Sequence, residues 1–156
     1  MSTATPLDAT PIAEGLFTWP SDSPALIGTR CGSCGEVTFP SHYGCPRCAS
    51  EAMVPFELST TGTVWTWTTQ NFRPPPPYSG PEEFTPYHVG YVELAGEVIV
   101  ETYLTGYGDG RPTIGDKVEL VVGYGDFTTV LHDEFYGFRG ETLEVVWPIL
   151  GRGKLQ

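Results

Sequence analysis

The sequence Arg30-Cys-Gly-Ser-Cys-Gly35 is followed by a second motif of the same spacing, Cys45-Pro-Arg-Cys48, with ten residues between Cys34 and Cys45. These two Cys-x-x-Cys pairs contain all four cysteines of the chain. Two residues between cysteines let the backbone curl into a knuckle that directs both sulfurs to one point. Gly35 accepts a positive φ after the first pair, and Pro46 fixes φ within the second. The stretch therefore predicts a Cys₄ metal site on a short β-ribbon.

Four thiolates in a tetrahedral arrangement favour zinc, with each sulfur at about 2.3 Å from the ion. Iron in a rubredoxin-like site uses the same ligands, so the ligand set leaves both ions open. Two disulfides are a third interpretation, but the chain lacks a charged-then-apolar leader, and we therefore expect it in the reducing cytoplasm. A thioredoxin-like role needs a single Cys-x-x-Cys on a βαβ unit, and no such unit is indicated here.

The predicted ligands are all thiolates, which has consequences for the role of the ion. Four protein ligands close the coordination sphere and leave no position for water or substrate, so we expect a structural ion rather than a catalytic one. The predicted ligands are Cys31, Cys34, Cys45 and Cys48. Arg30 and Arg47 flank them and are expected to offset the negative charge of the centre.

The charge of the chain limits its partners. Its 156 residues carry a formal net charge of −11, and a surface of that sign repels polyanions. This argues against nucleic acid, the first partner that a zinc ribbon suggests. No apolar run approaches the ~20 residues that span a bilayer, so a membrane partner is not expected either.

The chain divides into four stretches. We expect residues 1–29 to form an N-terminal extension, residues 30–58 the zinc ribbon, residues 59–147 a β-barrel, and residues 148–156 a tail. The extension has no lysine or arginine and several prolines, so a long helix is not expected there. Its large apolar residues, Leu16, Phe17 and Trp19, either fold back onto the domain or dock on another subunit.

The region after the ribbon has the composition and period of β-strands. Glycine (19 residues) and proline (15 residues) are plentiful, which points to strands joined by turns. Ala95-Gly96 is a plausible hairpin turn. The expected strands are Thr63–Thr69, Tyr87–Leu94, Glu97–Leu104, Val118–Val122 and Leu143–Trp147, with Phe127–Leu131 extending the fourth or starting the fifth. Five strands in this length match an OB-fold barrel, although another small barrel or an open sandwich has the same count.

Several motifs in this order resemble the DUF35 family of zinc-ribbon and OB-fold proteins. The resemblance runs from about Leu26 to about Val146, and it is weakest after Gly125. The motifs are Arg30–Gly35, Phe39-Pro40, Cys45–Cys48, Gly62–Thr68, Pro86-Tyr87, Gly90–Leu94 and Ile114-Gly115. The resemblance implies a mainly β protein with an N-terminal ribbon and a five-stranded OB-fold barrel.

The resemblance also implies a partner. Proteins similar to this one act beside thiolase-superfamily enzymes, among them thiolases and lipid-transfer-protein-like retro-aldolases that shorten acyl-CoA side chains, including those of steroids. By this likeness the chain is a non-catalytic, zinc-binding accessory subunit that assembles with a large subunit, as a heterotetramer, and binds or shields coenzyme A or acyl-CoA.

The histidines do not suggest catalysis. His42 lies between the knuckles, where four thiolates already suffice, and His88 lies in a strand run. His132 precedes Asp133 and Glu134, but neighbours in sequence need not share a site. We expect surface or structural roles for all three, which agrees with a subunit that lends no catalytic group.

The proline-rich loop between Asn71 and Pro86 is the best candidate for ligand or partner contact. It joins the first two barrel strands, and that loop commonly serves recognition in OB-folds. Arg73 is suited to pair with a phosphate of coenzyme A. The aromatic candidates for contact with coenzyme A or with the partner are Tyr78, Phe84 and Tyr87. The alternative is a stiff polyproline spacer without a ligand.

Two other functions fit parts of the sequence. A ribbon with an OB-fold can bind single-stranded nucleic acid through stacking aromatics, and Trp65 and Trp67 provide these, although a basic groove is missing. A stand-alone redox or iron protein is the other alternative.

Overall fold

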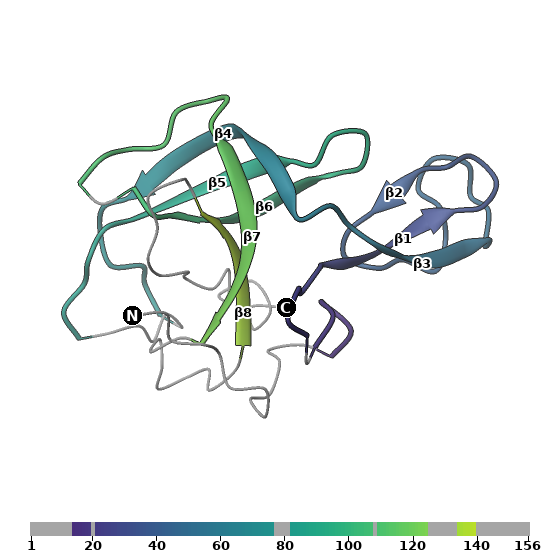
Figure 1. Cartoon of the computed structure of the whole chain (residues 1–156), viewed down its shortest axis with the longest axis horizontal. Coiled ribbons are helices and arrows are strands. Elements are labelled where there is room, and N and C mark those ends of the chain that lie inside the picture. The colour runs from purple at the N-terminus through teal and green to yellow at the C-terminus, as the bar shows by residue number, and fades with distance from the viewer. Residues whose placement is uncertain (1–13, 20, 77–81, 108, 125–133, 140–156) are drawn as a thin grey trace.

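A computed structural model of the chain describes residues 14–19, 21–76, 82–107, 109–124 and 134–139. These residues form eight β-strands and no helix, arranged as a small ribbon beside a barrel (Figure 1). The part of the chain that is described therefore contains no helix that could cross a membrane. The predicted mainly β architecture is confirmed.

The ribbon is a three-stranded antiparallel sheet in the order β2-β1-β3. Its strands are β1 (Ile27–Cys31), β2 (Val37–Thr38) and β3 (Met53–Glu57). Thr29 lies in the middle of the sheet, opposite Thr38 on one side and Pro55 on the other. β1 thus begins at Ile27 and ends on Cys31, so the strand itself fixes the position of the first cysteine.

The barrel is closed by five strands in the order β4-β5-β6-β8-β7, with β7 pairing back to β4. The strands are β4 (Thr61–Gln70), β5 (Tyr87–Glu93), β6 (Ile99–Thr105), β7 (Lys117–Tyr124) and β8 (Glu134–Arg139). β6 and β8 run parallel, and every other pair is antiparallel. This closed Greek-key arrangement is the OB-fold that the sequence predicted.

Four of the five expected barrel strands agree with β4 to β7 within two residues at each end. The expected turn at Ala95-Gly96 is also present: Gly96 has φ +73°, and the Glu97 N–H donates to the Leu94 carbonyl. The closing strand differs from the expectation, because β8 occupies Glu134–Arg139, which has little strand-like alternation. The predicted runs Leu143–Trp147 and Phe127–Leu131 lie outside the described residues.

One hydrophobic core joins the barrel to the ribbon. Residues of the barrel strands alternate between buried and exposed, and the buried set includes Val64, Val92 and Val100. The same core cluster contains Leu26 and Val37 from the ribbon side. Burial of each such side chain stabilises the fold by about 1.5–3 kcal/mol relative to exposure, so the two parts support one another.

The segment before the ribbon packs on this core. Phe17 is 4 % exposed, and Leu16 and Trp19 pack beside it. Phe17 also forms an antiparallel bridge with Leu26. Phe17 therefore folds back onto its own domain, the first of the two arrangements expected for these residues.

Candidate metal centre

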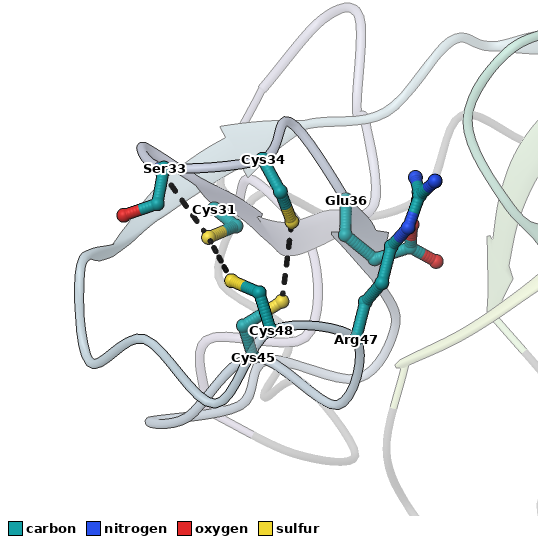
Figure 2. A network of polar contacts seen from close by, with 7 residues as sticks. All are labelled: Cys31, Ser33, Cys34, Glu36, Cys45, Arg47 and Cys48. Atoms are coloured by element: carbon teal, nitrogen blue, oxygen red, sulfur yellow. Dashed lines mark hydrogen bonds and ion pairs between the residues drawn. The ribbon is translucent and has the colours of Figure 1, made fainter.

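The four cysteines come from two knuckles on facing sides of the ribbon (Figure 2). Cys31 ends β1 and Cys34 follows it in a turn, whereas Cys45 and Cys48 lie on the connection between β2 and β3. In each knuckle the residue after the second cysteine returns its N–H to the carbonyl of the first. Gly35 donates to Cys31 and Ala49 donates to Cys45, both over 2.9 Å.

The sulfurs fit a tetrahedral ion. The Sγ atoms of Cys31 and Cys48 are 3.6 Å apart, and those of Cys34 and Cys45 are 3.5 Å apart. All four lie within 4.8 Å of one another. Sulfurs at about 2.3 Å from a central ion would be about 3.8 Å apart, whereas a disulfide needs about 2.0 Å. The donor set and its spacing therefore fit zinc and do not fit disulfides.

Backbone N–H groups of the first knuckle favour the thiolates of both Cys31 and Cys34, but the pKa values of the two cysteines shift in opposite directions. The Cys34 backbone N–H lowers the pKa of Cys31 to about 6, against the effect of burial. The Glu36 backbone N–H favours the Cys34 thiolate, but burial and the sulfurs of Cys45, Cys48 and Cys31 raise its pKa to about 12. Four close thiolates repel one another, so a divalent cation is required to hold them all deprotonated.

Buried hydroxyl groups hold the loop that leads to the second knuckle. Thr29 and Thr38 are both buried, and their Oγ1 atoms are hydrogen-bonded at 2.7 Å. The backbone N–H of His42 donates to the Thr29 Oγ1 at 3.0 Å. His42 is therefore anchored through its backbone, and within the part of the chain that the structure describes the four cysteines gather as a candidate metal cluster.

The two flanking arginines have partners of their own. The Arg47 guanidinium forms an ion pair with Glu36 at 3.4 Å, and Arg30 stacks over the Phe56 ring at 3.9 Å. Both contacts lie on the ribbon, and the expected role of the two arginines as counter-charges to the metal centre stays a prediction.

The loop between β4 and β5 brings together some of the residues proposed for coenzyme A or partner contact. Arg73 is exposed, and its Nη1 donates to the Glu82 carbonyl at 3.1 Å. Phe84 and Tyr87 pack edge to face with their ring centroids 6.0 Å apart. Tyr78 lies outside the described residues. A direct contact with coenzyme A stays a prediction.

Sequence reasoning missed two features of the surroundings. The rings of Tyr87 and Tyr103 lie 4.8 Å apart, and those of Trp65 and Tyr91 lie 6.2 Å apart. The signal was the two-residue alternation along β5 and β6, which places every second side chain on one face. The same alternation that locates the strands also predicts which side chains face outward.

His88 has structural partners. Its Nδ1 is 2.9 Å from the Thr69 hydroxyl and its Nε2 is 3.3 Å from the Gly110 carbonyl. These contacts agree with the predicted structural role. His132 lies outside the described residues.

The fold and the centre together define a class of protein: a Cys₄ zinc ribbon joined to an OB-fold barrel. Family models agree with this division. The model described as the rubredoxin-like zinc ribbon domain of ChsH2 matches residues 19–54, and the model of its C-terminal OB-fold domain matches residues 56–123.

Similar proteins have been characterised as subunits or scaffolds. The benzoylsuccinyl-CoA thiolase subunit BbsA of Thauera aromatica is 33% identical over 118 residues, which cover 74% of this chain and 77% of BbsA. A DUF35 domain-containing scaffold protein of Pyrococcus furiosus is 36% identical over 96 residues, which cover 62% of this chain and 67% of that protein. A chain in a solved structure of an Ltp2-ChsH2(DUF35) aldolase superposes with a TM-score of 0.57 at 28% identity, covering 74% of this chain and 84% of that chain. This chain belongs to the DUF35 family.

Proposed function

We propose that this chain is a non-catalytic accessory subunit of a thiolase-superfamily enzyme, a thiolase or a retro-aldolase, that acts on acyl-CoA. The observation that carries the proposal is the closed Cys₄ centre on a ribbon that shares its core with the barrel. Such a centre offers no open coordination position, so its value lies in rigidity. The names of the similar proteins, a thiolase subunit and a component of an aldolase, support the choice of partner.

The ribbon and barrel would act by presenting a fixed surface to the large subunit. A bound zinc ion would cross-link the two knuckles and contribute on the order of 10 kcal/mol to the folding of this short segment. The chain's own side chains would then complete the wall of the acyl-CoA tunnel and exclude water from it, while the partner's residues break or form the carbon–carbon bond. We extend the proposal to side-chain degradation of a steroid or another lipid, in a cytoplasmic heterotetramer.

The assembly role is tested with Cys45→Ser. Because Cys45 is buried and supplies one of the four sulfurs, the variant should lose stoichiometric zinc and fail to co-purify with the co-expressed large subunit. Metal analysis of the wild-type chain should find one zinc per chain. A soluble, fully active complex that carries Cys45→Ser would refute the assembly role.

Contact with coenzyme A is tested separately with Arg73→Ala. If the guanidinium pairs with a phosphate, the affinity of the assembled complex for coenzyme A should fall by about tenfold, as expected for one charge-assisted contact. Arg47→Ala is the matched control, because it removes an exposed guanidinium from the ribbon. Equal affinities of the Arg73→Ala and wild-type complexes would contradict the contact and leave the assembly role standing.

A further inference from the structure

We propose that the outer surface of β4, β5 and β6 is the surface on which the large subunit docks, with its apolar and acidic side chains facing an apolar centre bordered by basic residues on the large subunit. This inference rests on the proposed function and assigns it a place on the molecule. We call this surface the aromatic face, and it consists of Trp65, Tyr91, Glu93, Ile99, Glu101 and Tyr103. The positions follow from the strand register: Tyr91 lies opposite Glu101, and Glu93 lies opposite Ile99.

The aromatic face gathers three of the exposed large apolar side chains among the described residues. Trp65 is 53% exposed, and Tyr91 and Ile99 are each 41% exposed. They lie on three adjacent strands, with Trp65 and Tyr91 in edge-to-face contact. Clustered exposed apolar groups mark interaction sites, and tryptophan and tyrosine are enriched among the residues that dominate binding energy.

Trp65 faces outward because of a local break in the pairing of β4 with β5. The register shifts between Val64, which lies opposite Val92, and Thr66, which lies opposite Tyr91. Trp65 is the extra residue of this bulge, so Val64 keeps its place in the core at 1% exposure while the indole turns to solvent. Bulges re-aim side chains in this way and recur near binding sites.

The charges of the aromatic face decide between possible occupants. β4, β5 and β6 contain two carboxylates, Glu93 and Glu101, and no lysine or arginine. Lys117 of β7 reaches the border of the face, where its Nζ donates to the Thr63 hydroxyl at 2.8 Å. The same surface of OB-folds serves oligonucleotides when it is basic. Here the carboxylates add to a net charge of −11 and repel phosphates. The complementary occupant is a protein surface in which arginine or lysine borders an apolar centre.

Affinity measurements with single variants test the assignment. We expect a thiolase-superfamily protein to be encoded beside this chain's gene, and the probe is that protein, purified and titrated with the full chain. Trp65→Ala and Tyr91→Ala should each raise the Kd by about tenfold or more. Tyr43→Ala is the matched control, because it removes an aromatic ring that is 98% exposed on the ribbon, and its Kd should stay within about twofold of wild type.

Two further measurements separate charge from packing and folding. The double variant Glu93→Gln and Glu101→Gln should bind the large subunit with a higher Kd than wild type. Added salt should raise the Kd of wild type and leave the Kd of the double variant unchanged. In hydroxyl-radical footprinting of the wild-type complex, Trp65 and Tyr91 should be protected and Tyr43 should stay reactive. This measurement uses only wild-type protein, so it does not depend on the folding of any variant.

The possible outcomes separate a failure of the docking-surface assignment from a failure of the proposed function. If wild type binds and both aromatic variants bind equally well, or if Tyr43→Ala loses as much affinity, the assignment of this face is overturned and the subunit role stands. If wild type fails to bind the large subunit, the proposed function fails too. Salt-sensitive binding of a labelled oligothymidylate that Trp65→Ala abolishes would assign the face to nucleic acid and overturn the proposal.

Discussion

The residue that follows each Cys-x-x-Cys pair has the same backbone conformation and makes the same hydrogen bond in both knuckles. Gly35 and Ala49 both have a positive φ, +78° and +59°, and both return an N–H to the first cysteine of their pair. Glycine adopts this conformation without penalty, whereas alanine pays about 1–2 kcal/mol. The second knuckle therefore carries backbone strain that the first avoids.

Ala49→Gly should stabilise the zinc-bound protein by about 1 kcal/mol, because it removes this strain at a small entropic cost. Chemical denaturation of the zinc-loaded chain measures the effect. Ala52→Gly is the control: its φ is not positive, so the same change should destabilise the protein slightly. A loss of stability in Ala49→Gly comparable to that in Ala52→Gly would contradict the role assigned to φ.

His88 is a titratable group that the fold keeps neutral. Burial lowers its pKa below the ordinary value, the positive charge of Arg111 lowers it further, and the Gly110 carbonyl acts in the opposite direction. The imidazole also packs edge to face with Trp67 and Tyr107. Because the folded pKa lies below the unfolded one, the unfolded chain binds the proton more readily.

The stability that depends on neutral His88 should be present above the unfolded pKa of about 6.5 and be lost as the pH falls through the folded pKa. His88→Gln, which keeps a polar side chain, should reduce the fall in melting temperature between about pH 7.5 and about pH 5. Both proteins share the zinc centre, so acid loss of the metal cancels in the comparison. Parallel melting curves across this range would exclude His88 as a source of the acid sensitivity.

At the scale of elements, β5 is packed so tightly beside β4 and β6 that one of its positions has no room for a side chain. A Cβ on Gly90 would lie 2.5 Å from the Thr66 carbonyl oxygen, 2.7 Å from Leu104 Cδ1 and 3.1 Å from Trp67 Cβ. The backbone φ of Gly90 is ordinary, so space and not conformation requires glycine there. Leu104 comes from β6, so the contact fixes three neighbouring strands.

Gly90→Ala should destabilise the barrel by about 1–3 kcal/mol, as expected for overpacking against backbone atoms. Gly44→Ala is the matched control, since a Cβ there meets no atom within 4 Å and its φ is also not positive. That variant should be neutral or slightly more stable. Equal stabilities of the two variants, measured by denaturant unfolding, would show that β4 and β5 can separate without cost.

At the scale of the whole molecule, the ribbon and the barrel are not independent. Leu26 and Leu58 belong to the same cluster as Val64 and Val92, and the Leu58 N–H donates to the Leu26 carbonyl at 2.8 Å. Leu58 lies directly between β3 and β4, so the connection between the two sheets is itself part of the core. Loss of the ribbon would expose one side of the barrel core.

Removal of zinc by a chelator at neutral pH should therefore unfold both parts together. In a chain that carries Trp19→Phe and Trp147→Phe, the fluorescence comes from Trp65 and Trp67, which report on the barrel. Zinc release, followed by a colorimetric indicator, should coincide with the change in this fluorescence. A chain whose ribbon loses zinc while the barrel fluorescence stays native would disprove the coupling. Restoring zinc should recover both signals.

The sequence by itself determined the β class and four of the five barrel strands, and it located the four candidate metal ligands. Cys31 and its three partners could be identified because knuckle spacing is a local property, and strands such as β5 could be found because the two-residue period is local too. The ordinary composition of Glu134–Arg139 hid the closing strand, since β8 is held by pairing with β6 and β7. Its place depends on contacts between distant segments.

Only the tertiary structure decided which side chains meet. The positive φ of Ala49, the partners of His88, the packing of Phe17 on the core and the outward turn of Trp65 at a bulge are invisible in a linear pattern. The physical reason is that local backbone preferences fix the two-residue period of the strands and the turns of the knuckles. Closing the barrel, in contrast, sets the register between strands that lie far apart in the sequence. A shift of one residue in register moves a side chain from core to surface.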